Sequence, residues 1–224
     1  MNEGKVIVLE GLDGCGKSTQ LELAEKLLRE MGADYRTVSF PNYGSPSGEI
    51  VSMYLKGEIP AEGENGAYAA SSFYAVDRYM SWAADWSRDY NRGAVILSGR
   101  YTTSNAIYQM TKLPAEKRGE YLKWLEDYEY EKLGLPRPSL VIYLDMPQEV
   151  SDKLLSKRYG GDESKKDIHE SNAAFLKACR ESAEFAAQYW GWSRVSCASG
   201  GEPLSIEEIH ARTAALIKGA LSDV

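Results

Sequence analysis

Short apolar runs alternate with longer segments of helical periodicity along the whole chain. The apolar runs predict five strands, at residues 5–10, 35–40, 94–98, 139–145 and 192–198, the last of them an edge strand. Elsewhere apolar residues recur every three or four positions. This spacing predicts helices over residues 18–31, 49–55, 67–92, 103–110, 114–133, 148–157, 168 to about 189, and onward from a capping box at Ser205 and Glu208. Such alternation is typical of an α/β fold with a mostly parallel sheet.

One very polar stretch interrupts the helical pattern after the fourth strand. Residues 158–167 read RYGGDESKKD, with six charged side chains and two adjacent glycines. This stretch is the best candidate for a lid. No internal repeat or low-complexity linker divides the chain, so residues 1–224 are predicted to form a single domain.

The charge balance limits the classes of partner. The 224 residues include 26 Lys and Arg against 33 Asp and Glu, a formal net charge of −7. A globally acidic protein is a poor general binder of nucleic-acid polymers and anionic membranes, so any bound anion must meet a local basic cluster. No apolar run approaches the roughly 18–20 residues of a membrane helix, and the chain starts without a signal-peptide pattern. With three widely spaced cysteines, we expect a cytoplasmic protein without a disulfide framework.

A glycine-rich loop follows the first predicted strand. Residues 11–18 (GLDGCGKS) fit the pattern G-x-x-x-x-G-K-[ST] between a strand and a helix, the context of a phosphate-binding loop. Its glycines let backbone N–H groups converge on phosphate oxygens, and the helix that follows points its positive end at the same anion. Lys17 would place its charge on the transferring phosphate, and the Ser18 hydroxyl would bind Mg²⁺. The predicted ATP-binding residues of the loop are Gly11, Asp13, Gly14, Cys15, Gly16, Lys17, Ser18 and Thr19.

The loop alone does not choose among kinases, ATPases and GTPases. A GTPase would need an N-K-x-D base reader, and none occurs in the sequence. Cys15 is first of all a small residue of the loop. Its place at a helix N-terminus would in addition lower the pKa of its thiol and open it to alkylation that ATP blocks.

Several further motifs, taken together, resemble those of the thymidylate kinases. The loop is similar to that family's E-G-x-D-G-x-G-K-[ST] starting at Glu10, residues 40–41 match its F-P element, and residues 134–138 read GLPRP. Arg100 precedes the run SNAIYQ at residues 104–109. The resemblance extends from about residue 5 to residue 188. It implies a P-loop NTPase-type three-layer fold, with a mostly parallel five-stranded sheet flanked by helices and a lid segment.

The same resemblance implies an activity and an assembly. The activity is the ATP- and Mg²⁺-dependent phosphorylation of dTMP to dTDP, with small nucleotides as the only partners besides a second copy of the chain. The implied homodimer would form through long helices such as the one that contains Trp82 and Trp86.

The resemblance also assigns the acceptor site. It implies that Tyr74 stacks on thymine, that Arg78 donates to the O4 carbonyl, and that Asn105 reads the N3–H and O4 edge of the base. Tyr108 would stand where a ribose 2′-OH points, which favours a deoxy sugar. The full set of implied acceptor residues is Asp13, Phe40, Pro41, Tyr43, Tyr74, Arg78, Arg100, Ser104, Asn105, Tyr108 and Gln109.

Phosphoryl transfer would use charges from the loop, the sheet edge and the lid. Asp13 resembles the carboxylate that accepts from the sugar 3′-OH, and Arg100 suits bidentate contact with the acceptor phosphate. Because Gly14 stands where some family members have an arginine, the lid must supply further cations. The implied catalytic residues are Lys17, Arg100 and Arg158, with Lys165 and Lys166 as further ATP-binding residues of the lid.

Two positions depart from the family pattern. The family's D-R-Y begins with Gly99 here, which removes an aspartate near Mg²⁺ and leaves Glu10 as the nearest substitute carboxylate. Its F-P-x-R ends in Tyr43, so a phosphate-facing arginine is replaced. Two alternatives therefore stay open, a deoxynucleoside kinase and a nucleotide-binding protein with weakened catalysis. Because Arg100 remains, we predict that dTMP is still the preferred acceptor, with a raised KM rather than a switch to thymidine.

Overall fold

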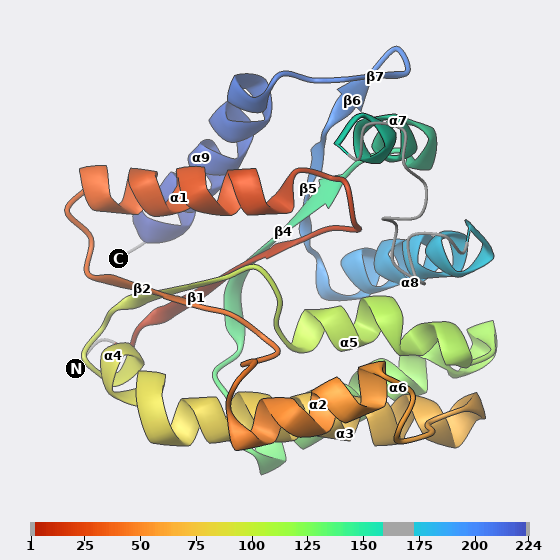
Figure 1. Cartoon of the computed structure of the whole chain (residues 1–224). Helices are drawn as coiled ribbons and strands as arrows, with labels where there is room; N and C mark the ends of the chain where they lie inside the picture. Colours follow the sequence, from red (N-terminus) through yellow and green to blue (C-terminus); the bar gives the residue numbers. More distant parts are fainter. Residues whose placement is uncertain (1–2, 159–172, 223–224) are drawn as a thin grey trace.

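A parallel sheet forms the centre of the protein, whose computed structural model describes residues 3–158 and 173–222. The strands are β1 (Lys5–Glu10), β2 (Tyr35–Val38), β3 (Val95–Ser98), β4 (Pro138–Asp145) and β5 (Ser193–Ser196). They lie in the order β2-β3-β1-β4-β5, so β5 is an edge strand as predicted (Figure 1). Because β1 pairs in parallel with both β3 and β4, the carboxyl ends of these three strands share one edge of the sheet.

The residues of β1 face opposite sides of the sheet in turn. Val6 and Val8 pack in one apolar cluster and Ile7 and Leu9 in the other, and all four are fully buried. A strand that is buried on both faces needs helices on both sides of the sheet. The predicted three-layer arrangement is therefore the one observed.

Helices cover both faces of this sheet. On one face lie α1 (Lys17–Glu30) and α9 (Ile206–Ser222), which pack against each other (Figure 1). On the other face lie α3 (Gly63–Ser81), α5 (Thr102–Tyr108), α6 (Arg118–Leu125) and α8 (Ala173–Trp190). α2 (Pro46–Leu55) packs on α3, and α7 (Gln148–Arg158) follows β4.

Two helices that the sequence predicts as continuous are divided. The helix expected over residues 67–92 consists of α3, a π-helical segment η1 (Trp82–Trp86) and α4 (Ser87–Asn91). The helix expected over residues 114–133 consists of the 3₁₀ turn η3 (Ala115–Lys117), α6 and a π-helical segment η4 (Glu126–Lys132). A further 3₁₀ turn, η2 (Met110–Lys112), follows α5. π-Helical turns are rare and occur often at functional sites.

The tryptophans of η1 belong to the core. Trp86 is fully buried, and its ring centroid lies 4.5 Å from that of Trp82, which packs against the same cluster. The part of the long helix that contains Trp82 and Trp86 therefore packs on the core, and a homodimer through long helices stays an expectation.

The C-terminal part contains one element that the sequence pattern did not predict. β6 (Ala198–Ser199) and β7 (Glu202–Pro203) form a small antiparallel hairpin between β5 and α9. The predicted capping box is confirmed, because Ser205 Oγ accepts from the Glu208 backbone N–H at 3.1 Å and Glu208 Oε2 accepts from that of Ser205 at 2.9 Å. Within the described residues, no helix is both long and apolar enough to cross a membrane. The expected lid lies outside the described residues, apart from the backbone of Arg158.

Candidate active site

The glycine-rich loop connects β1 to α1 at the carboxyl edge of the central strand. Gly14 and Gly16 have φ values of +77° and +85°, the left-handed region that glycine adopts without strain. α1 begins at Lys17, no side chain caps its N-terminus, and its first turn has no acidic residue. The first backbone N–H groups of α1 are therefore available to an anion.

Two polar side chains of this loop are placed for phosphate chemistry. The Lys17 ammonium bends back over the loop, where Nζ donates to the carbonyl oxygen of Gly11 at 2.8 Å. Burial lowers the pKa of Lys17, and the nearby Arg100 guanidinium lowers it further, so a phosphate on the loop would favour its charged form. Ser18 is exposed at the start of α1, which leaves its hydroxyl open to a ligand.

The thiol of Cys15 lacks the reactivity that the sequence predicts. The side chain is 1% exposed and packs in the apolar cluster under α1. Burial raises the pKa of its thiol, which outweighs the lowering by Lys17. The expectation of a lowered pKa and ready alkylation is therefore wrong, because the loop turns the thiol into the core.

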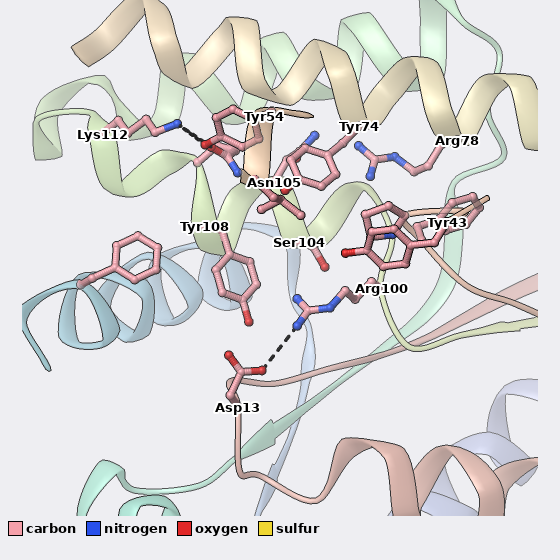
Figure 2. Close-up of a pocket in the computed structure, with 15 residues that line it drawn as sticks. Asp13, Tyr43, Tyr54, Tyr74, Arg78, Arg100, Ser104, Asn105, Tyr108 and Lys112 are labelled. Atoms are coloured by element: carbon pink, nitrogen blue, oxygen red, sulfur yellow. Dashed lines mark hydrogen bonds and ion pairs between the residues drawn. The ribbon is translucent and has the colours of Figure 1, made fainter. Parts of the chain in front are cut away.

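A cavity of about 290 Å³ opens beside the loop (Figure 2). It is lined by every residue that the resemblance assigns to the acceptor: Asp13, Phe40, Pro41, Tyr43, Tyr74, Arg78, Arg100, Ser104, Asn105, Tyr108 and Gln109. Four further residues line it that the sequence did not single out: Tyr54, Leu55, Lys112 and Phe175. The sequence-predicted residues thus come together, and their individual roles stay predictions.

One end of the cavity carries the charges expected for a phosphate. Arg100 follows β3, and its Nη2 lies 3.5 Å from Oδ1 of Asp13 (Figure 2). The same guanidinium lies 5.0 Å from the ring centroid of Tyr108. Burial alone would lower the pKa of Arg100, but Tyr108 and the carboxylates of Glu10 and Asp13 raise it, so the residue stays cationic. Arg100 and Asp13, which the resemblance assigns to the acceptor phosphate and the sugar, thus pair with each other.

Glu10 lies behind this end of the cavity, at the last position of β1, and is fully buried. Its Oε1 accepts from Thr103 Oγ1 at 2.7 Å and from Ser104 Oγ at 2.6 Å. Its Oε2 is buried without a hydrogen-bond partner in the described part of the chain. The Ser104 hydroxyl is thereby committed to Glu10 rather than to the cavity.

The other end of the cavity combines an aromatic ring with a buried ion pair. Tyr74 and Arg78 lie on one face of α3, as their spacing predicts (Figure 2). Arg78 Nε and Nη2 each donate to Glu129 at 2.6 Å, and both side chains are almost completely buried. Glu129 does not line the cavity, and sequence reasoning missed it.

Asp77 fixes the segment that carries Tyr43. This buried carboxylate accepts from the backbone N–H of Asn42 at 2.7 Å and from Ser47 Oγ at 2.8 Å. The segment follows the cis peptide bond between Phe40 and Pro41. Tyr43 itself is 64% exposed at the cavity and can donate only one neutral hydrogen bond where the family has an arginine.

Lys112 brings an unexpected cation to the cavity. Its Nζ donates to the Tyr54 hydroxyl and to Gln109 Oε1, both at 2.8 Å (Figure 2). Both partners are neutral, and burial lowers the pKa of Lys112 to about 8.

We expect Lys112 to titrate near pH 8, whereas an ordinary lysine titrates near about 10.4. The folded protein would therefore lose this charge as the pH rises through 8. ¹³C NMR of reductively methylated protein measures the titration, with the Lys112→Arg variant to assign the signal and Lys26, exposed on α1, as the reference. A Lys112 signal that titrates above pH 10 would contradict this assignment.

Comparisons with known proteins agree with the motifs. A sequence model described as thymidylate kinase matches residues 9–201. The thymidylate kinase of Mycobacterium tuberculosis is 31% identical over 190 residues, covering 83% of this chain and 87% of the relative. That of Nostoc punctiforme is 28% identical over 83% and 84% of the two chains, and the probable thymidylate kinase of Pyrococcus abyssi is 28% identical over 97% and 98%. The chain therefore belongs to the thymidylate kinase family.

Proposed function

We propose that this protein transfers the γ-phosphoryl group of ATP to dTMP, with Mg²⁺ bound at the phosphate loop, and releases dTDP and ADP. An oxygen of the dTMP phosphate attacks the γ-phosphorus, and the bond from that phosphorus to the β–γ bridging oxygen breaks. The relatives from Mycobacterium tuberculosis and Nostoc punctiforme are thymidylate kinases, which supports this choice of acceptor.

The observation that best supports the proposal is that the phosphate loop lies next to Arg100 of the acceptor cavity. Asp13 belongs to the phosphate loop, yet it lines the acceptor cavity and lies 3.5 Å from Arg100. An acceptor phosphate held by Arg100 therefore lies next to the phosphates held by the loop. Phosphoryl transfer depends mostly on such positioning and on charge neutralisation.

The residues of the loop fit ATP and Mg²⁺. The backbone N–H groups and Lys17 would hold the donor phosphates, and the Ser18 hydroxyl would offer an oxygen ligand to the metal. No cluster of three His, Cys, Asp or Glu side chains occurs in the described ranges, as suits an ion that is held largely by nucleotide phosphates and water. Bound Mg²⁺ neutralises charge on the donor phosphates.

The charges of the site favour a monophosphate over a nucleoside acceptor. A nucleoside hydroxyl needs a carboxylate within proton reach, whereas a monophosphate needs cations. Asp13 is paired with Arg100, and Glu10 is fully buried and does not line the cavity. Since Tyr43 replaces one cation, we expect a raised KM for dTMP. A neutral donor holds an anion less well by about 1–2 kcal/mol.

Several parts of this proposal concern residues or properties beyond the site. The side chains of Arg158, Lys165 and Lys166 lie outside the described residues, and we keep them as the cations that close over the phosphates. We also propose that residues 1–224 form one domain and that the protein is located in the cytoplasm. We expect it to bind neither membranes nor nucleic-acid polymers. The homodimer is assigned to the exposed apolar side chains of α2 and α3, which are Ile50, Leu55, Val76, Tyr79 and Met80.

An ADP-release assay with equal concentrations of dTMP and thymidine tests the acceptor. We expect ADP release that depends on dTMP and is faster with dTMP than with thymidine. Faster turnover with thymidine would favour the deoxynucleoside kinase. ATP binding without turnover on either acceptor would favour the catalytically weakened protein, and both results contradict the proposal.

Replacing Lys17 by alanine should lower kcat by about 100-fold or more, because the lysine acts on charge that develops in the transition state. The Lys26→Ala variant is the matched control, since Lys26 is exposed on the same helix. Steady-state kinetics and circular dichroism of both variants provide the measurement. Near-normal kcat in Lys17→Ala would remove the lysine from the mechanism.

Light scattering tests the assembly. Two copies of the 24.9 kDa chain should give about twice that mass. Met80→Asp should shift the mass toward one protomer, because it buries a charge in the contact. A wild-type mass near one protomer would refute the dimer.

A further inference from the structure

Glu129 accepts four hydrogen bonds in a fully buried position on η4. Its Oε2 accepts from Arg78 Nε at 2.6 Å and from Thr102 Oγ1 at 2.8 Å. Its Oε1 accepts from Arg78 Nη2 at 2.6 Å and from Asn105 Nδ2 at 3.1 Å. The carboxylate thus contacts Arg78 and Asn105, the two residues that the resemblance assigns to hydrogen bonds with the edge of the base.

These contacts fix the orientation of the Asn105 amide. Nδ2 donates to Glu129 Oε1 at 3.1 Å and to the backbone carbonyl oxygen of Ser71 at 3.3 Å. Both partners only accept hydrogen bonds, so turning the amide over would set its oxygen against two acceptors. Asn105 lines the cavity, and its Oδ1 accepts no hydrogen bond from the described residues. The residue therefore presents an acceptor to a ligand.

The same carboxylate fixes the orientation of Arg78. With Nε and one N–H of Nη2 held by Glu129, the guanidinium plane is set. The second N–H of Nη2 and the two N–H groups of Nη1 remain, and Nη1 uses one of these to donate to the carbonyl oxygen of Tyr101 at 3.4 Å. Arg78 lies at the wall of the cavity on the same helix face as Tyr74 (Figure 2). It therefore presents a donor to a ligand that stacks on Tyr74.

An acceptor and a donor fixed in this way select one class of pyrimidine. Thymine and uracil offer a donor at N3 and an acceptor at O4, which complements Asn105 Oδ1 and Arg78 Nη1. Cytosine offers an acceptor at N3 and a donor at N4, so it would face like groups.

We propose that Glu129 is a positioning residue that sets the base specificity of the acceptor site by holding Asn105 as an acceptor and Arg78 as a donor. This inference rests on the proposed transfer to a pyrimidine nucleoside monophosphate. Glu129 touches no substrate and acts through the two residues it holds.

A purely structural role for the pair makes a different prediction. Loss of a buried partner would then reduce the folded fraction and slow the turnover of every acceptor equally. The ratio of kcat/KM for dTMP to that for dCMP is independent of the amount of folded enzyme, so it separates the two roles.

Glu129→Gln is the direct test. Its amide Nε2 can replace an acceptor by a donor, which removes the shorter of the two hydrogen bonds that keep Nδ2 of Asn105 turned away from the cavity and leaves only the one to Ser71. We expect the ratio of kcat/KM for dTMP over dCMP to fall by about tenfold or more, mainly through the KM for dTMP, as loss of one specific hydrogen bond would cause. A ratio within about twofold of the wild-type ratio would overturn the proposal.

Two further variants keep the test decisive. Glu129→Asp retains the charge that buried Arg78 requires, but its shorter side chain cannot hold Arg78 and Asn105 together. We expect the ratio of kcat/KM for dTMP over dCMP to fall at least about threefold in Glu129→Asp. An unchanged ratio in this variant overturns the proposal, even if Glu129→Gln does not fold. Glu126→Gln makes the same substitution on η4, at a partly exposed pair with Arg137, and should leave the ratio unchanged.

The wild-type protein distinguishes failure of this inference from failure of the proposed function. If it phosphorylates neither dTMP nor dCMP, the proposed function fails, and the inference fails with it. If it phosphorylates dTMP selectively and the Glu129 variants keep that selectivity, the inference alone fails.

Discussion

The ion pair between Arg78 and Glu129 constrains the half of the protein that holds the acceptor cavity. Both side chains are buried, and breaking such a pair by removing one partner costs about 3–5 kcal/mol because a bare charge remains. The pair joins α3 to η4, and Asn105 and Thr102 attach α5 to the same carboxylate. The π-helical turn of η4 carries Glu129 to this point. The fold thereby holds α3, α5 and η4, which are distant in sequence, together at the end of the cavity that Tyr74 and Arg78 line.

The parallel sheet constrains the other half of the site. Because β1 and β3 are neighbours and run in the same direction, the phosphate loop after β1 and Arg100 after β3 meet at one edge. The contact between Asp13 and Arg100 is the direct result, and it brings the phosphate loop next to the cavity. The strand β1 is buried on both faces, which anchors the loop that follows it. The end of the cavity at Arg100 thus depends on the topology of the sheet, whereas the end at Tyr74 depends on a buried ion pair.

Local patterns in the sequence predicted the strands and the phosphate loop, because these features depend on residues that are close in sequence or follow a repeat of two or 3.6 positions. The family resemblance, and not periodicity, implied the acceptor residues that line the cavity. The sequence did not identify Glu129 or Lys112 as residues of the site, because the partners that give them a role are distant along the chain. Glu129 contacts Arg78, 51 positions away, and Lys112 contacts Tyr54, 58 positions away. The prediction for Cys15 failed for a related reason. The sequence shows that Cys15 lies near a helix N-terminus, but it does not show the burial that raises the pKa of the Cys15 thiol.

The base specificity that we propose depends on a hydrogen bond that Asn105 accepts from N3–H of a bound pyrimidine. Proton NMR of dTMP labelled with ¹⁵N at N3, bound to the wild-type protein, observes this hydrogen directly. We predict a bound N3–H signal that exchanges slowly with water, because the group would be buried and its acceptor is held in place. Bound dTMP whose N3–H exchanges as fast as in the free nucleotide would contradict it.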